Sequence, residues 1–289
     1  MPKVVKLLLW LFVGLLAMVK LSACFQFRDA NTKVEKEYAL DGFDIQTKRI
    51  TTEYGKVNFI RTNFSDSTKP IVIFVHGSPG SSNNFNNNLR DSALRSHFEM
   101  ISVDRLGFGH SEFGHSEPSL FKQAAAVNEV VKLFPNRRFI VVGHSYGGPV
   151  AAKMAMDYPE NIYGLVLAAG SIDPSLEPKD KWRKPANSKL VRWMLPRSLV
   201  ASNQEILPLK EELTLMLPQW EKLTQPVTVI QGLEDELVLP ENADFAQRVI
   251  TNSIKLRIYK VPNQNHFIPF QHHQLITDAL IELLPDLGE

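Results

Sequence analysis

Three side chains of the kind that perform nucleophilic catalysis follow one another along the chain as Ser145, Asp235 and His266. A serine hydroxyl is a weak nucleophile at neutral pH and needs an adjacent base. His266 could take the proton of Ser145 and later deliver it to a leaving group, while Asp235 would fix the imidazole tautomer and stabilise the imidazolium. These residue types predict acyl transfer, provided that the surrounding elements bring the three side chains together.

Ser145 lies in a pattern typical of a sharp turn between a strand and a helix. The apolar, β-branched run at residues 139–142 predicts a buried strand, and small and helix-forming residues at 150–156 predict a helix. Residues 143–147 between them fit G-x-S-x-G, with glycines that remove colliding Cβ atoms from the turn. Ser145 would then be exposed at the helix N-terminus, where the N–H of Tyr146 could face a developing oxyanion.

In this context the pentapeptide resembles the nucleophile elbow of the α/β-hydrolases. A second resemblance follows the apolar run 71–75, which leads into H-G-S-P-G at residues 76–80. In this family the residue after His-Gly donates its backbone N–H to the oxyanion hole, and here that residue is Ser78. Pro79 has no N–H and could not take the role. The resemblance therefore implies an oxyanion hole formed by the backbone N–H groups of Ser78 and Tyr146.

Two later motifs supply the acid and the base. G-x-x-D-x-x-V follows the apolar run 227–231 and selects Asp235. His266 follows the last predicted strand, 255–261, where the family has its catalytic histidine. The order serine, aspartate, histidine is that of the α/β-hydrolases. Asp173, after the preceding strand, is an alternative acid position in the superfamily.

Other polar residues receive structural interpretations. Asp104 opens D-x-x-G-x-G-x-S after the strand predicted at 98–103 and is expected to bind loop N–H groups. His144 is a poor base because it directly precedes Ser145, and neighbouring side chains diverge. No metal is predicted, since no H-E-x-x-H helix frames the histidines and glutamates of the loop 110–117.

Five motifs in this order span residues 71–267, and the resemblance implies the α/β-hydrolase fold, a mostly parallel central sheet with helices on both faces. The hydrolase domain is expected over residues 48–289, opening with a hairpin of edge strands. Strand patterns stop at 174–226, which is predicted to be a small helical cap whose apolar residues could line a substrate entrance. Residues 25–47 are polar and poorly periodic and are predicted to form a tether.

The implied activity is hydrolysis of an ester or related acyl bond of a small-molecule substrate through an acyl-enzyme, with no cofactor. Aminopeptidase-like, perhydrolase or C–C hydrolase chemistry could use the same triad, and Glu205, Glu211 or Glu212 of the cap could read a substrate amine. A nucleophilic aspartate, as in epoxide hydrolases and dehalogenases, is disfavoured because the elbow has Ser145. A further alternative is a non-catalytic binding protein on this fold, although such proteins commonly lose a triad member.

The composition is ordinary for a globular protein. The chain has 289 residues, of which 44% are hydrophobic and 22% charged, and its net charge is +1. This is enough for one large α/β domain with an insertion. A near-neutral chain gives no indication of a nucleic-acid partner. The oligomeric state is not predicted.

The N-terminal segment 1–24 is predicted to be a signal or membrane anchor. Two lysines precede the 13-residue uncharged run 7–19, which matches a secretory signal and is short for a membrane span. After Lys20 comes L-S-A-C, which resembles the lipobox of bacterial lipoproteins, whose cysteine is lipidated; Lys20 departs from that pattern. Cys24 is the only cysteine, which excludes a disulfide within the chain. We expect an envelope protein held at a membrane by lipid on Cys24, with an uncleaved helical anchor or ordinary secretion as alternatives.

Overall fold

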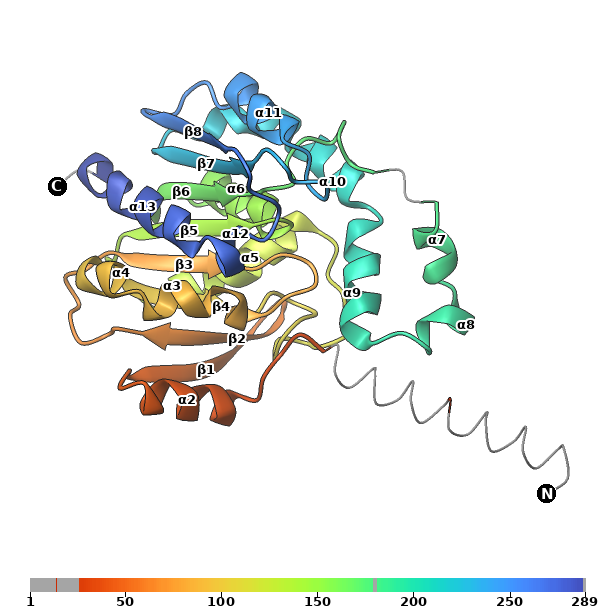
Figure 1. The fold of residues 1–289 in the computed structure, drawn as a ribbon, viewed down its shortest axis with the longest axis horizontal. Helices are drawn as coiled ribbons and strands as arrows, with labels where there is room; N and C mark the ends of the chain where they lie inside the picture. Colours follow the sequence, from red (N-terminus) through yellow and green to blue (C-terminus); the bar gives the residue numbers. More distant parts are fainter. Residues whose placement is uncertain (1–13, 15–25, 179–180, 288–289) are drawn as a thin grey trace, which may run out of the picture.

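A computed structural model describes Gly14 and residues 26–178 and 181–287; Cys24 and the remainder of the predicted signal segment lie outside these residues. One eight-stranded sheet runs through the described chain in the order β1-β2-β4-β3-β5-β6-β7-β8 (Figure 1). Every pair from β4 through β8 is parallel, whereas β2 pairs antiparallel with β1 and β4. The prediction of a mostly parallel central sheet is therefore confirmed.

The strands of the middle of the sheet are apolar on both faces. All five residues of β3 are buried, with Ile73 in one hydrophobic core and Phe74 in another, because successive side chains of a strand point to opposite faces. Continuous apolar runs therefore mark strands that are covered on both sides. The strands are β1 Ile45–Thr52, β2 Gly55–Thr62, β3 Ile71–Val75, β4 Glu99–Val103, β5 Phe139–His144, β6 Ile162–Ala168, β7 Val227–Gly232 and β8 Leu256–Val261.

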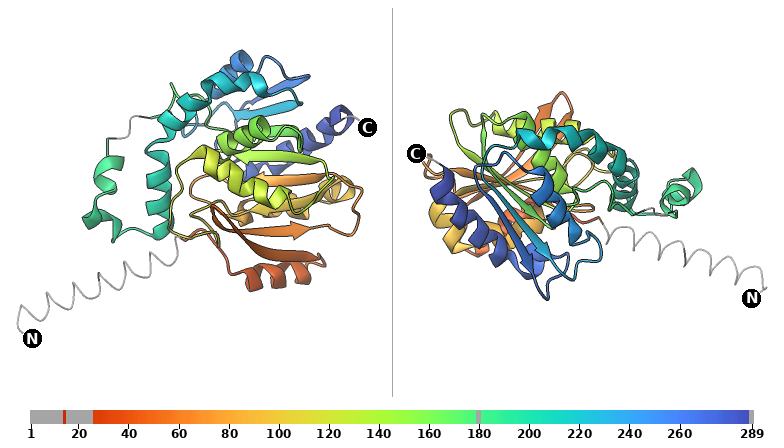
Figure 2. Two further views of the ribbon diagram at one scale, coloured as in Figure 1. Left: turned by 180° about the vertical axis from the view of Figure 1, so that it is seen from behind. Right: turned by 90° about the horizontal axis from the view of Figure 1, so that it is seen from above.

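Helices cover both faces of the sheet (Figures 1 and 2). One core contains residues of α5 Leu120–Val131, α6 Gly147–Asp157 and α11 Glu241–Val249. The other contains residues of α2 Asn31–Leu40, η1 Ser82–Phe85, α3 Asn86–Arg90, α4 Ser92–His97, α12 Ile268–Gln271 and α13 His273–Leu283, which is followed by the short helix η3 Leu284–Leu287. The sheet and its two helical layers thus form one body that presents the ends of the strands at its edges.

Residues 25–47 differ from the expected tether, because residues 31–40 form α2 and β1 already begins at Ile45. Val34 and Tyr38 of α2 are buried in the same core as Ile60 of β2. These two side chains are four residues apart and therefore lie on one face of the helix. A single apolar pair in a polar segment is a weak sequence signal, and its burial depends on the sheet edge that it covers.

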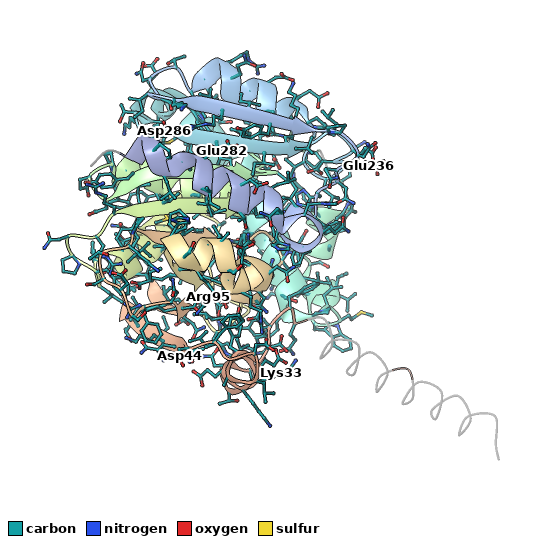
Figure 3. The ribbon with its side chains drawn as sticks, turned by 60° about the vertical axis from the view of Figure 1, so that its left-hand side comes forward. Lys33, Asp44, Arg95, Glu236, Glu282 and Asp286 are labelled. Carbon is teal, nitrogen blue, oxygen red and sulfur yellow. The ribbon has the colours of Figure 1, made fainter. Side chains whose placement is uncertain are left out.

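The C-terminal helix is tied to the edge strand β8 by charged side chains. Glu282 accepts a hydrogen bond from the hydroxyl of Tyr259, and Asp286 pairs with Lys255 at 3.0 Å and also with Arg257. Glu282 and Asp286 are labelled in Figure 3, where both lie at the end of the sheet that is remote from Lys33 of α2. These contacts fix the strand whose far end leads into His266.

Between β6 and β7 a loop over residues 169–178 is followed by a series of short helices, at the position predicted for a cap. The elements are α7 Arg183–Ala186, α8 Lys189–Arg192, α9 Arg197–Ile206, α10 Leu209–Met216 and the short helix η2 Leu217–Lys222. Leu213 and Trp220 of α10 and η2 are buried in the core beside α11. By contrast, α7 and α8, which are fully described, bury no residue and stand away from the body (Figure 2).

The parallel strands all end at one edge of the sheet, which is where ligands bind in open α/β sheets. Ser78 follows β3, Ser145 follows β5, Asp235 follows β7 and His266 follows β8. The sheet thus brings four residues that are far apart in sequence to one place. Within the described ranges, no helix combines the length and apolar character that a membrane crossing requires.

Candidate active site

Ser145 occupies a strained turn between β5 and α6. Its φ is +55°, in the left-handed region that non-glycine residues seldom adopt. A Cβ added at Gly143 would lie 2.3 Å from the carbonyl oxygen of Gly147, and one added at Gly147 would lie 2.2 Å from that of Val75. The backbone is therefore packed too closely for any side chain at these two positions. This geometry explains the glycines of the motif and projects the serine out of the turn.

Asp235 and His266 form a hydrogen-bonded pair. The Oδ2 atom of Asp235 lies 2.8 Å from Nδ1 of His266, and both residues are buried. Oδ1 of Asp235 accepts the backbone N–H groups of Leu237 at 2.9 Å and Val238 at 2.8 Å, and Gln231 donates to Oδ2 at 3.3 Å. The carboxylate is thus held by four donors, and its bond to Nδ1 leaves Nε2 of the imidazole for another partner.

Asp173, the alternative acid, is engaged elsewhere. Its Oδ1 accepts the backbone N–H and the hydroxyl of Ser175 at 2.8 and 2.7 Å, and its Oδ2 lies 3.6 Å from Arg248. Its own backbone N–H is bound by Asn242. The histidine therefore has Asp235 as its carboxylate partner, while Asp173 organises the start of the cap segment.

One small cavity collects the remaining predicted site residues. Ser145, His266, Ser78 and Tyr146 all line a space of about 150 Å³. The loop after β3 passes directly over the elbow, since a Cβ on Gly77 would lie 2.8 Å from Cβ of Ser145. The candidate nucleophile, a histidine and the two residues expected to supply oxyanion N–H groups therefore face the same space.

His144 packs against the imidazole of His266. Its Nε2 lies 2.9 Å from the carbonyl oxygen of His266, so Nε2 is the protonated nitrogen, and the two imidazole rings are 4.9 Å apart. Burial, and then repulsion by His266, lower the pKa of His144 to about 3. The ring stays neutral near pH 7 and adds no charge beneath His266. Sequence spacing had excluded His144 as a base but gave no sign that it packs against one.

A buried ion pair joins the loop after β4 to the cap, and its arginine also binds the loop after β3. The guanidinium of Arg105 binds Glu205 of α9 in a bidentate manner, with both N–O distances 2.8 Å, and both side chains are fully buried. The same guanidinium donates to the carbonyl oxygens of His76 at 2.8 Å and Gly77 at 3.0 Å. Ser78 adds a second link to the cap, because its hydroxyl donates to that of Ser202 at 2.8 Å.

These contacts fix the candidate oxyanion loop from behind. The carbonyl groups of His76 and Gly77 point towards Arg105. The peptide between Gly77 and Ser78 is thereby held over Ser145. The ring of Tyr146 lies 4.5 Å from the same guanidinium, which connects the elbow to the pair. Sequence patterns gave Arg105 no role in the site and indicated Glu205 only as a residue that could bind a substrate amine. The only available signal was the arginine inside the D-x-x-G-x-G-x-S motif.

Asp104 has the structural role expected of it. Its carboxylate accepts the backbone N–H groups of Ser82 at 2.7 Å and His110 at 2.9 Å, and the side-chain amide of Asn58 at 2.9 Å. His110 also binds the carbonyl oxygen of Asp29, which turns it out of the loop cluster. Across the parts of the chain that the structure describes, no group of three or more His, Cys, Asp or Glu side chains could hold a metal ion.

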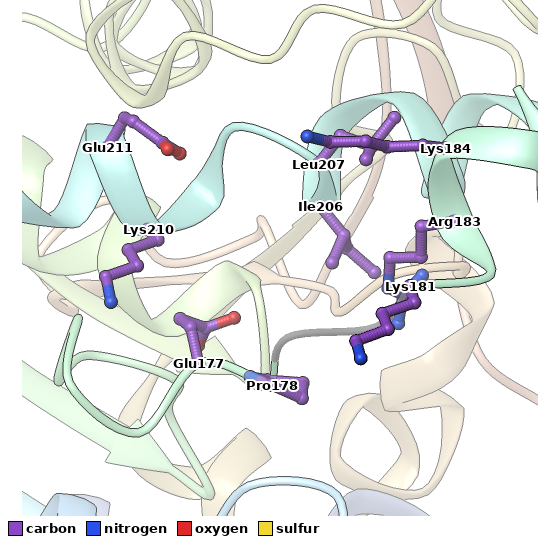
Figure 4. A pocket seen from close by; sticks show the side chains of 9 residues that line it. All are labelled: Glu177, Pro178, Lys181, Arg183, Lys184, Ile206, Leu207, Lys210 and Glu211. Carbon is purple, nitrogen blue, oxygen red and sulfur yellow. The ribbon is translucent and has the colours of Figure 1, made fainter.

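A second, larger cavity adjoins the first. It has a volume of about 390 Å³ and shares Glu177, Pro178, Arg183 and Ile206 with the smaller one. Figure 4 shows Lys181, Arg183 and Lys184 along one side of it, with Lys210 opposite. The walls of the larger cavity come from α7, α9 and α10 and from the segment before α7, and most of its charged side chains are basic.

Comparison with known proteins agrees with this geometry. Residues 70–205 match the family model described as alpha/beta hydrolase fold. The proline iminopeptidase of Lactobacillus helveticus is 33% identical over 121 residues, which are 40% of this chain and 41% of that protein. The chain therefore spans about two fifths of the length of that curated relative.

Solved structures resemble the whole described body. A membrane phospholipase A has a TM-score of 0.66 at 17% identity, covering 98% of this chain and 97% of its own. The epoxide hydrolase CorEH has a TM-score of 0.66 at 21% identity, covering 85% and 100%. The α/β-hydrolase family model thus matches residues 70–205, and the solved structures confirm the α/β-hydrolase fold for the described chain.

The buried pair gives a testable prediction about stability. Glu205→Ala leaves Arg105 as an uncompensated buried charge and should lower the free energy of unfolding by about 3–5 kcal/mol, as measured by urea denaturation. The double variant Arg105→Met/Glu205→Leu removes both charges and should recover part of that loss, because the carbonyl oxygens of His76 and Gly77 then lack the guanidinium donors. A Glu205→Ala protein as stable as the wild type, or a double variant no better than the single one, would contradict the assignment.

Proposed function

We propose that the protein is a serine hydrolase that cleaves an ester or related acyl bond. Ser145 attacks the carbonyl carbon while His266 takes the hydroxyl proton, and Asp235 stabilises the resulting imidazolium. The N–H groups of Ser78 and Tyr146 receive the oxyanion of the tetrahedral intermediate. His266 then protonates the leaving alcohol, and the acyl group stays on Ser145. A water molecule, activated by the same histidine, hydrolyses this acyl-enzyme.

The observation that supports the proposal most strongly is the bonded pair Asp235–His266 beside the strained elbow of Ser145. The 2.8 Å contact, the positive φ and the shared cavity are three independent features of one arrangement. A strained backbone is retained only where its surroundings enforce it, and such strain gathers at functional sites. A serine at the elbow also disfavours the aspartate-nucleophile chemistry that the likeness to an epoxide hydrolase would otherwise suggest.

Ester cleavage is favoured over aminopeptidase chemistry by the partners of the cap glutamates. The proline iminopeptidase match raises the possibility of a substrate amine that binds a cap carboxylate. However, Glu205 is neutralised by Arg105, and Glu212 accepts the backbone N–H of Leu120 at 2.9 Å. Glu211 lines the larger cavity together with Glu177, but four basic residues outnumber these two carboxylates there and disfavour a cationic substrate. p-Nitrophenyl esters of rising chain length should therefore be cleaved faster than aminoacyl anilides.

The identity of the nucleophile can be tested by covalent labelling. A fluorophosphonate probe should label the wild-type protein at Ser145, because an activated serine attacks phosphorus as it would a carbonyl carbon. Labelling should disappear in Ser145→Ala, while Ser171→Ala, which alters another serine of the same cavity, serves as the matched control. Undiminished labelling of Ser145→Ala, or an unreactive wild type, would argue for a different nucleophile or for a non-catalytic binding protein.

The identity of the acid can be tested by comparing two aspartates. Asp235→Asn should lower kcat on an ester substrate by roughly 10⁴, because the amide no longer holds the imidazole in the correct tautomer. Asp173→Asn should leave kcat within about ten-fold of the wild type, since Asp173 binds Ser175 and Arg248 instead. The reverse pattern in steady-state kinetics would move the acid to Asp173.

We also propose that the hydrolase acts while held at a membrane through its segment 1–24. The charge-flanked apolar run and the lipobox-like L-S-A-C of the sequence support an anchor with lipid on Cys24. One protein of similar fold, whose solved structure covers 98% of this chain, is named a membrane phospholipase A. Localisation is then the cell envelope, with the hydrolase domain outside the cytoplasm.

Lipidation predicts a defined response to one substitution. Cys24→Ser should abolish incorporation of a clickable fatty acid and block cleavage, so that the protein keeps its full-length mass. Several acyl chains, each worth about 0.8 kcal/mol per buried CH₂, are ample for stable anchoring. If Cys24→Ser leaves mass and membrane fractionation unchanged, an uncleaved helical anchor replaces the lipid. Recovery of the wild-type protein in the cytosol would contradict both forms of anchor.

A further inference from the structure

The part of the cap that stands away from the body presents large apolar side chains to solvent. We name residues 181–194, which include α7 and α8, the cap arm. Four of its side chains are exposed, Trp182 by 58%, Leu190 by 74%, Trp193 by 64% and Met194 by 45%. The two helices bury none of their residues, and Figures 1 and 2 show them apart from the sheet. Two exposed tryptophans within twelve residues make this a surface that is suited to a partner.

The same arm is strongly basic. Residues 181–197 contain six Lys or Arg and no Asp or Glu, although the whole chain balances 32 Lys and Arg against 31 Asp and Glu. Lys181, Lys184 and Lys189 are exposed, and the guanidinium of Arg183 lies 4.7 Å from the ring of Trp182. Cations and apolar side chains are therefore interleaved on one short, projecting segment.

Specific contacts hold the arm in this position. The side-chain amide of Asn203 donates to the carbonyl oxygen of Arg183 at 2.9 Å, and that of Gln204 donates to Asn187 at 3.3 Å. Both amides belong to α9, whose Glu205 is bound to Arg105 inside the body. The arm is thus fixed at its base by a helix that is itself fixed to the core, and its apolar side chains remain outside.

From these features we propose that the cap arm docks on an anionic phospholipid surface. Tryptophan places an apolar ring and a polar N–H at the boundary of a bilayer, and leucine and methionine enter its acyl region. Lysine and arginine bind lipid phosphates, and their alkyl stems follow the apolar surface. Protein–protein interfaces, by contrast, are depleted in lysine, so the charge of the arm favours a lipid partner. The proposal needs neither the triad nor lipid on Cys24.

Docking of the arm would place the larger cavity beside the lipid. Lys181, Arg183 and Lys184 belong to the cap arm and also line one wall of that cavity. The described chain resumes at residue 26 on the same side of the molecule, because Arg28 donates to Gly109 and the Arg197 side chain lies against Gly114 of the same loop. A protein held at a membrane through residues 1–24 would therefore keep the cap arm close to that surface.

Tryptophan quenching by brominated lipid tests the docking without reference to catalysis. The full-length protein with Trp10→Phe is reconstituted into vesicles of brominated phosphatidylcholine, with or without phosphatidylglycerol, and its presence is checked by flotation. Trp182 and Trp193 should be quenched in the anionic vesicles, while Trp220, which is 1% exposed, should not. Adding Trp182→Ser and Trp193→Ser should remove most of the quenching.

Charge variants distinguish the partner. Lys184→Glu/Lys189→Glu should reduce the ratio of docked to undocked protein by roughly five-fold for each positive charge lost, and high salt should act in the same direction. The matched control is Lys222→Glu/Ile254→Ser, which alters an exposed cation and an exposed apolar residue at the opposite edge of the sheet. This control should leave the ratio of docked to undocked protein unchanged.

Three outcomes would overturn the proposal. One is the absence of quenching in either vesicle although the protein floats with both, which would leave the arm to a protein partner. Another is quenching that persists undiminished without Trp182 and Trp193. The third is equal quenching in neutral and anionic vesicles that is insensitive to the lysine reversals.

Discussion

The pair between Arg105 and Glu205 is the interaction on which the rest of the site depends. The two opposite charges are fully buried, so each requires the other, and the remaining donors of the guanidinium must find acceptors. Arg105 uses those donors on the carbonyl groups of His76 and Gly77. The requirement to satisfy one buried guanidinium thereby fixes the loop that faces Ser145, and it attaches α9 of the cap to the core.

The candidate triad relies on a different constraint, the packing of backbone against backbone. Gly77, Gly143 and Gly147 allow the loop after β3 and the start of α6 to approach the elbow more closely than any side chain would permit. This closeness holds Ser145 in its positive-φ conformation within reach of the loop. The carboxylate of Asp235 is fixed separately, by two backbone N–H groups and Gln231. The parallel sheet joins these locally fixed groups, because its strands end along one edge.

The cap has two surfaces with different chemistry. Its inner side, formed by residues such as Ile206 and Leu209, closes the small cavity over Ser145. Its outer arm is basic and rich in tryptophan, and the helices α7 and α8 of this arm bury none of their residues. Under the proposed function this division has a physical reason. An acyl substrate in a lipid phase would have to reach the half-buried Ser145, and a cap that touched that phase would shorten the path through water.

The sequence alone determined what depends on local spacing. Apolar runs identified the buried strands, paired glycines identified the elbow at Ser145, and motif order along the chain selected Asp235 and His266. Tertiary structure decided what depends on residues far apart in sequence. The bond of His266 to Asp235 rather than Asp173, the support from His144 and the pairing of Arg105 with Glu205 follow from strand order and cap placement. Residues 31–40 became α2 because a sheet edge was present to bury Val34 and Tyr38, and no local pattern encodes that edge.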